Sequence, residues 1–166
     1  MVRHGLAIAA FCGLGVAAAA QETSVSLGPL VQDTSLPVEV TSDQLTVENE
    51  LGIAIFEGNV IVVQGLMTLT APWVKVEYSE KEDPEAADID QMTARGGVTF
   101  VNGVDAAESE DAVYRPDAGD LVMTGSVLLT QGPSIMSGQK LTVDLIAGTG
   151  LMEGRTRTIF QQSDGN

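Results

Sequence analysis

FEGNVIVVQG, residues Phe56–Gly65, is followed along the chain by two similar segments, ARGGVTFVNG at Ala94–Gly103 and MTGSVLLTQG at Met123–Gly132. An alignment on the first glycine of each segment produces one column, which LMEGRTRT extends: Gly58, Gly96, Gly125 and Gly154. The spacings within this column are 38, 29 and 29 residues, which indicates about four units of roughly 29 residues. Repeated units of this size bury their apolar faces by stacking on one another.

A second column contains small residues, namely Ser42, Ala71, Ser109 and Gly138. It lies 16 residues before the glycine in three units and 25 residues before Gly96 in the remaining one. The longer unit therefore contains an insertion of nine residues, which must fall in the polar run SEKEDPEAAD at Ser79–Asp88. A proline and six charged residues in this run predict a solvated loop between strands.

Within each unit, every second residue through the glycine column is apolar. These positions are Ala54, Phe56, Val60 and Val62; Met92, Ala94, Val98 and Phe100; and Leu121, Met123, Val127 and Leu129. The intervening positions are mixed, and Val, Thr and Ile are abundant. Alternation with a period of two predicts antiparallel strands with one dry face, so the chain is all-β.

The glycine in the middle of each such strand predicts a bulge or bend that curves the sheet. From typical strand and turn lengths we expect about three strands per unit, rolled into a sandwich or an open barrel. The interior is either filled by its own side chains, which composition alone favours, or open to an apolar ligand. Few aromatic residues and five methionines, which adapt to irregular guests, favour a ligand groove: Met67, Met92, Met123, Met136 and Met152.

Residues 1–20, MVRHGLAIAAFCGLGVAAAA, have the charged start, apolar run and small-residue end of an export signal. We expect cleavage before Gln21. A retained anchor is the alternative, although the apolar run of 16 residues is shorter than the roughly 20 that a spanning helix needs. After cleavage we expect an extended segment at 21–36, one β domain at 37–160 and a flexible C-terminus at 161–166.

Cleavage would remove Cys12 and His4, the only cysteine and histidine of the chain. The remaining 146 residues would lack a thiol nucleophile, an imidazole base and the usual zinc ligands, so we expect no cofactor and no metal site. Loss of Arg3 would change the formal charge from −15 to −16, which disfavours nucleic acid as a partner. Two carboxylate pairs, Asp88 with Asp90 and Asp117 with Asp120, lie in polar connections and are better explained as turn formers than as catalysts.

The unit TSDQLTVENELGIAIFEGNVIVVQG has the pattern S-D-x-L-x-V followed by G-x-V-x-V-x-x-G, and MSGQKLTVDLIAGTGLMEGRTRT is an echo of it that keeps the L-x-V and the first glycine. From about Pro37 to Phe160 the chain resembles the OstA-like family, in particular its LptA branch of periplasmic lipopolysaccharide transport proteins of Gram-negative bacteria. The resemblance implies that 37–160 is a β-jelly-roll whose apolar groove holds the acyl chains of lipid A. The alternating apolar positions given above would then line this groove.

The resemblance also implies a role in outer membrane biogenesis. The chain would be a periplasmic carrier that passes lipopolysaccharide from the inner to the outer membrane, joined to the jelly-roll domains of LptC-like and LptD-like proteins. Because the chain is acidic, we expect the acyl chains to be bound and the phosphorylated head group to remain in water. Two alternatives are a structural periplasmic β-repeat assembly protein and, if the N-terminus is not cleaved, an inner-membrane-anchored LptC-like subunit.

A roll built from stacked units leaves a first and a last strand, and we expect both to be unpaired. The expected assembly edges carry Val38 and Val40 at the start and Arg155, Arg157, Ile159 and Phe160 at the end. Acidic residues accompany the first edge and arginines the last. Opposite charges at opposite edges predict head-to-tail association by strand addition, between copies or with a partner of the same fold.

Overall fold

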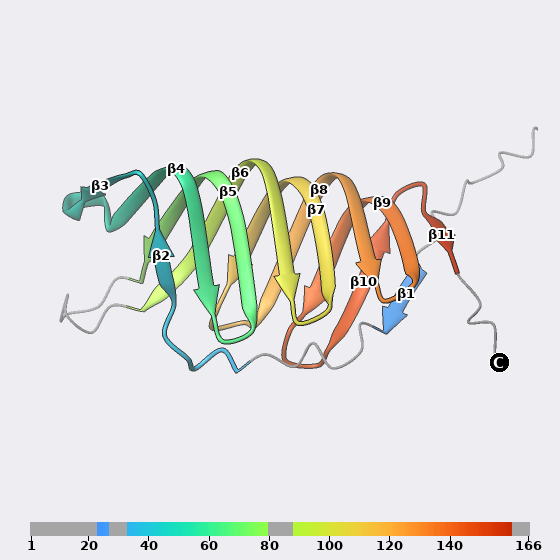
Figure 1. Ribbon diagram of the computed structural model, residues 1–166. Helices are drawn as coiled ribbons and strands as arrows, with labels where there is room; N and C mark the ends of the chain where they lie inside the picture. Colours follow the sequence, from blue (N-terminus) through green and yellow to red (C-terminus); the bar gives the residue numbers. More distant parts are fainter. Residues whose placement is uncertain (1–22, 27–32, 80–87, 161–166) are drawn as a thin grey trace, which may run out of the picture.

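The computed structural model describes residues 23–26, 33–79 and 88–160, and these form one antiparallel sheet folded along its length (Figure 1). The predicted signal peptide and the predicted C-terminal tail lie outside the described residues. The strands are β1 (Thr23–Ser26), β2 (Glu39–Thr41), β3 (Gln44–Glu48), β4 (Ile53–Gln64), β5 (Met67–Tyr78), β6 (Ile89–Asn102), β7 (Asp105–Arg115), β8 (Asp120–Gln131), β9 (Ser134–Asp144), β10 (Thr149–Glu153) and β11 (Arg157–Ile159). A short 3-10 turn, η1 (Asn49–Leu51), joins β3 to β4, and no helix among the described residues could span a bilayer.

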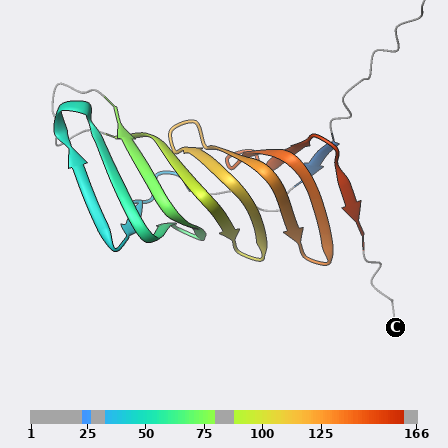
Figure 2. The ribbon, with the colours of Figure 1, turned by 90° about the horizontal axis from the view of Figure 1, so that it is seen from above.

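The sheet order is β1-β10-β9-β8-β7-β6-β5-β4-β2, with β3 also paired to β4 and β11 also paired to β9. Each strand from β4 to β9 has 11 to 14 residues and crosses the long axis of the roll obliquely (Figure 2). Each of the two middle units therefore contains two long strands that bend in the middle, β5 with β6 and β7 with β8, and the expectation of three strands per unit was wrong. That expectation assumed strands of typical length, whereas each long strand continues through its bend.

The bends lie at the glycine column, where the sequence predicted them, and also at the second column of small residues, where it did not. The register between β4 and β5 shifts between Glu57 and Val60, and matching shifts follow across β6, β7, β8 and β9. Backbone φ is positive at every glycine of the first column: Gly58 (75°), Gly96 (90°), Gly125 (81°) and Gly154 (91°). Glycine adopts this conformation without the steric cost that a Cβ brings, so it allows the sheet to fold over at these positions.

The bends divide the sheet into two halves that face each other. The first half-sheet consists of β2, β11 and the portions of the long strands beside them; the second consists of β1, β3, β10 and the remaining portions. Figure 1 shows the bends along one long side of the roll and the hairpin turns along the other. Three two-residue turns end the first half-sheet, at Gly65–Leu66, Gly103–Val104 and Gly132–Pro133. We call this side, where the strand ends of the two half-sheets meet, the hairpin side.

The sequence analysis did not predict that a strand from the segment 21–36 joins the sheet. β10 does not form an open edge, because β1 pairs with it from Thr23 opposite Met152 to Ser26 opposite Thr149. The repeat pattern does not reveal this strand, because β1 belongs to the segment 21–36, outside the repeats. Within the described residues, β1, β2, β3 and β11 each pair with one neighbour, so these four strands form the edges.

Candidate functional site

The interior between the two half-sheets contains the residues that the sequence assigned to a ligand groove. All of these except Phe56 are at most 4% exposed: Ala54, Val60, Val62, Met92, Ala94, Val98, Phe100, Leu121, Met123, Val127 and Leu129. Phe56 is half-buried and packs against the same core. The five methionines singled out in the sequence are also buried there. The repeat thus places one continuous apolar surface along the length of the roll.

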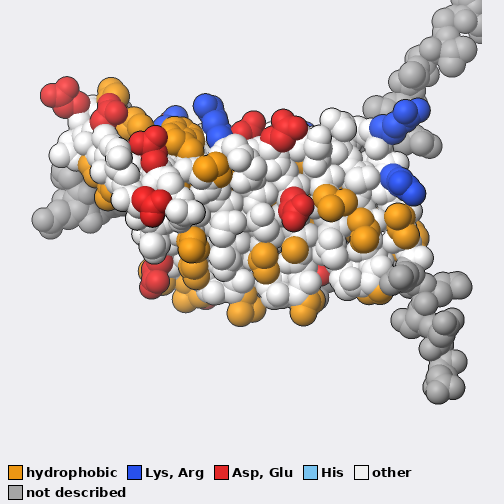
Figure 3. All heavy atoms as spheres, turned by 45° about the horizontal axis from the view of Figure 1, so that its top comes forward, with side chains coloured by type: hydrophobic (Ala, Val, Ile, Leu, Met, Phe, Trp, Pro, Cys, Tyr) orange, Lys and Arg blue, Asp and Glu red, His pale blue; other side chains and the backbone are white. Residues whose placement is uncertain are grey.

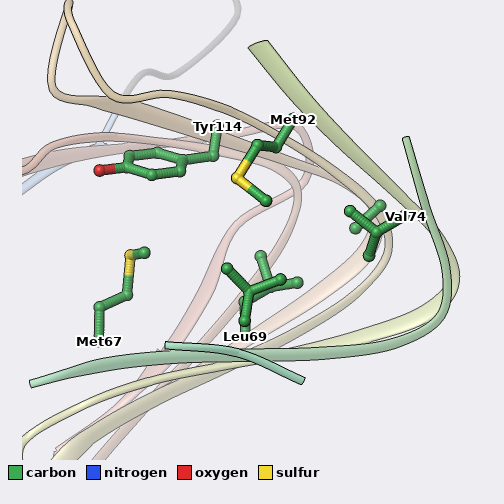
Figure 4. Close-up of a pocket in the computed structure, with 7 residues that line it drawn as sticks. Met67, Leu69, Val74, Met92 and Tyr114 are labelled. Atoms are coloured by element: carbon green, nitrogen blue, oxygen red, sulfur yellow. The ribbon is translucent and has the colours of Figure 1, made fainter. Parts of the chain in front are cut away.

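This interior is nearly filled by its own side chains. A residual cavity of about 10 Å³ lies between Val62, Met67, Leu69, Val74, Met92, Ala94 and Tyr114 (Figure 4). This volume is about that of one water molecule and is too small for an acyl chain. Binding of a lipid therefore requires the two half-sheets to move apart.

A buried hydrogen bond joins the half-sheets on the hairpin side. The Tyr114 hydroxyl, from the second half-sheet, donates to Gln64 Oε1, from the first, over 2.5 Å. Both side chains are at most 2% exposed, and burial raises the pKa of Tyr114 to about 12. The Gln64 side-chain amide in turn donates to the carbonyl oxygens of Thr34 (2.9 Å) and Leu36 (2.8 Å). We call this group the clasp, because it holds both half-sheets and the segment before β2 together.

Sequence reasoning missed the clasp, although a signal was present. Tyr114 occupies the +5 position of its unit, where Val76 and Val143 stand in the neighbouring units. A phenol at a position otherwise held by aliphatic residues needs a polar partner when it is buried. Gln64 is likewise a polar residue at the end of an apolar strand.

The predicted assembly edges differ in their exposure. Val38 and Val40 are half-buried against the core, so their side chains contribute to the roll as well as to its edge. Arg155 and Arg157 are exposed, as are Ile159 (44%) and Phe160 (76%). Arg157 and Ile159 lie in β11, whereas Arg155 precedes the strand and Phe160 follows it.

The first edge also contains residues that the sequence reading did not assign to assembly. Leu45 pairs with Phe56 and Val47 pairs with Ala54, so both side chains lie on the interior face. They are nevertheless 53% and 55% exposed, and Leu51 beside them is also exposed. The apolar interior is therefore open to solvent at this end of the roll, whereas β1 adds a further strand beside β10 at the other end.

Among the carboxylates considered as catalytic candidates, that of Asp120 has a structural partner. Arg115 Nε donates to Asp120 Oδ1 over 2.9 Å, and this hydrogen bond holds the pKa of Asp120 below its ordinary value. Ser79 and Asp88 close the base of the insertion loop, since the Ser79 amide donates to the Asp88 carbonyl over 2.8 Å. Residues 80–87 of that predicted loop lie outside the described residues. Within the described part of the chain, no cluster of three or more His, Cys, Asp or Glu side chains could hold a metal ion.

The folded antiparallel sheet with its apolar interior is that of a β-jelly-roll protein, and comparison with known proteins identifies the family. Residues 39–149 match the model of the LptA/(LptD N-terminal domain) LPS transport protein family, and the chain belongs to this family. An uncharacterized protein of Rhizobium meliloti (strain 1021) is 32% identical over 148 residues, which cover 84% of this chain and 80% of that protein.

The fold is similar to that of a solved structure. The match is to LptH of Pseudomonas aeruginosa, described as the LptA-homologous periplasmic component of the lipopolysaccharide transport device. The TM-score is 0.70, and the match covers 79% of this chain and 99% of LptH. Because the identity is 17%, this likeness supports the shared jelly-roll fold rather than any particular residue.

Proposed function

We propose that this protein is a periplasmic carrier that holds the acyl chains of lipopolysaccharide between its two half-sheets. In this role it would pass the lipid from the inner toward the outer membrane and would not act as an enzyme. The observation that supports the proposal most strongly is the continuous apolar interior in a member of a lipopolysaccharide transport family. Burial of ten methylene groups there would contribute on the order of 8 kcal/mol before costs.

The charge distribution favours binding through the acyl chains. The chain has 23 acidic residues and 8 basic ones, so a cluster of cations around the phosphates is not expected. The phosphorylated head group would stay in water on the hairpin side. Entry of the chains would open the clasp, because Tyr114 and Gln64 connect the two half-sheets there.

The two ends of the roll suggest how copies or partners join. The first end carries exposed apolar side chains of Leu45, Val47 and Leu51 together with acidic residues, whereas the other end carries Arg155 and Arg157. Figure 3 shows acidic side chains at one end and basic side chains at the other. Head-to-tail contact with a second copy, or with an LptC-like or LptD-like jelly-roll, would cover the open apolar end and pair opposite charges.

Extraction of bound lipid tests the carrier function. The mature protein, purified from a periplasmic fraction without detergent, should release acylated glycolipid that mass spectrometry identifies as lipopolysaccharide. Gln21 should be found at its N-terminus. Protein that is intact but free of lipid would contradict the carrier function, and recovery of uncleaved protein in membranes would favour the LptC-like alternative.

A structural β-repeat protein is the second candidate, and one observation favours it. The buried hydrophobic side chains of the described residues are at most 7% exposed, and the cavity between Val62, Met67 and Tyr114 has only about 10 Å³, as expected for a core that never opens. The substitution Met123→Leu separates the two functions because it keeps the volume while removing flexibility. A carrier should show altered lipid binding, whereas a structural repeat should show at most a small change in stability.

A further inference from the structure

A row of polar side chains lies just inside the hairpin side of the apolar interior. The row consists of five polar residues and Met67, and its successive residues are paired across neighbouring strands: Gln64, Met67, Asn102, Asp105, Gln131 and Ser134. Directly paired residues of antiparallel strands place their side chains on the same face of the sheet. Because Met67 belongs to the core, the whole row faces the interior. We call it the inner polar row.

The row follows from the repeat itself. Each two-residue turn of the first half-sheet is preceded by a side-chain amide, in Gln64–Gly65, Asn102–Gly103 and Gln131–Gly132. The amides lie in every second strand, β4, β6 and β8, so successive amides are two strand spacings apart, about 10 Å along the roll. The same chemical group is therefore presented three times at the same depth.

Two buried side chains of this row have fewer hydrogen-bond partners than buried polar groups usually have. Asn102 is 6% exposed, and its Nδ2 group has no hydrogen-bond partner among the residues that the structure describes. Asp105, paired directly with Asn102, is also 6% exposed, and among the described residues it accepts one long hydrogen bond, from Gln131 Nε2 at 3.4 Å. An unpartnered amide and a buried carboxylate cost free energy unless another group supplies the missing hydrogen bonds.

The chemistry of this pair restricts what could satisfy it. Asn102 offers a donor and Asp105 offers an acceptor, and direct cross-strand neighbours have Cβ atoms only about 5 Å apart. A group that carries both a carbonyl oxygen and an N–H or O–H is complementary to the pair. A phosphate is not, because the Asp105 carboxylate would repel it.

We propose that the inner polar row is a subsite for the neutral linkage groups of an acylated glycolipid, with Asn102 and Asp105 as its centre. A secondary amide between an acyl chain and a sugar would accept from Asn102 Nδ2 and donate to Asp105, while the chain continues into the core. This inference rests on the proposed function, since it assumes that acyl chains enter the interior. It assigns recognition to the amide group of the ligand and not to its phosphates.

Two probes of equal chain length test the subsite. N-myristoyl glucosamine has an amide between chain and sugar, whereas tetradecyl glucoside lacks that amide. Binding of each by the mature protein is measured by calorimetry for the native chain, for Asn102→Leu and for Gln139→Leu, a control that removes an exposed amide outside the row. We expect Asn102→Leu to weaken binding of the amide probe by several-fold to about tenfold and to leave the glucoside unchanged.

Stability measurements separate this role from a structural one. Because the Asn102 Nδ2 group has no partner, Asn102→Leu should leave the unfolding midpoint unchanged or raise it. A lowered midpoint with equal losses for both probes would overturn the subsite and indicate a packing role. Unchanged binding of both probes by Asn102→Leu would also overturn the subsite while leaving the carrier function intact. Failure of the native chain to bind either probe would contradict both.

Discussion

At the residue scale, Tyr114 is the side chain whose chemistry connects most directly to opening of the roll. Tyr114→Phe keeps the buried ring but removes the hydrogen bond to Gln64 Oε1. We expect a loss of about 1 kcal/mol in the free energy of unfolding, measured by urea titration at neutral pH. A phenylalanine variant as stable as the native chain would show that the hydrogen bond from Tyr114 to Gln64 contributes nothing to stability.

The same residue predicts a dependence on alkaline pH. Burial raises the pKa of Tyr114 from 10.0 to about 12, so the native state retains the phenol proton after the unfolded state has lost it. The stability that this adds is fully present below pH 10 and is lost as the pH rises toward 12. The native chain should therefore lose more stability than Tyr114→Phe over this interval, and urea titrations at several pH values measure the difference. Parallel profiles would contradict the assignment.

The bend glycines provide a second test at this scale. Gly125 has φ 81°, and a Cβ there would lie 2.8 Å from the Glu110 side chain. Gly132, in a hairpin turn, has φ 52° and open space around the Cβ position. We expect Gly125→Ala to destabilise the fold by roughly 1–3 kcal/mol and Gly132→Ala by about 1 kcal/mol, as measured by thermal unfolding. Equal effects would mean that the packed bend adds nothing beyond the cost of positive φ.

At the scale of single elements, β1 is the strand that the repeat pattern did not reveal. It pairs with β10 and extends the second half-sheet at the end of the roll where β11 lies. Deletion of residues 21–26, with the export signal kept, removes this strand. If partners join by strand addition, the deletion should expose β10 and increase end-to-end association in sedimentation experiments. A shift toward monomer would show instead that β1 takes part in the contact.

Disruption of the exposed strand β11 should weaken end-to-end association, which is the opposite of the effect expected for deletion of β1. Ile159 pairs with Ile135 and is 44% exposed, so Ile159→Pro disturbs the edge while leaving the buried core in place. We expect weaker assembly with an unchanged monomer fold, as judged by sedimentation and circular dichroism. Photo-crosslinkers at Val38–Thr41 and Thr156–Phe160 should capture neighbouring jelly-rolls. Crosslinks confined to the Ser79–Asp88 insertion would show that the ends are not the interface.

The elements also show how far sequence reasoning reached. The alternation and the glycine column predicted antiparallel strands, their buried face and their bends, because period-two burial and positive φ leave local signatures. Long-range pairing leaves no such signature. The contact of β1 with β10 and the bond of Tyr114 to Gln64 join segments far apart in sequence, so neither was predicted. The exposure of Leu45 and Val47 follows only from their place at the end of the roll.

At the scale of the whole molecule, the proposed carrier function requires the acyl chains to enter between the two half-sheets. A lipopolysaccharide probe that carries a diazirine on one acyl chain tests this directly, with the adducts mapped by mass spectrometry after illumination. If the acyl chains enter the interior, we expect adducts on interior residues such as Met67, Met92 and Met123, which are at most 4% exposed in the closed structure. Adducts confined to exposed apolar residues such as Leu66, Val104 and Ile135, with the interior unlabelled, would contradict it.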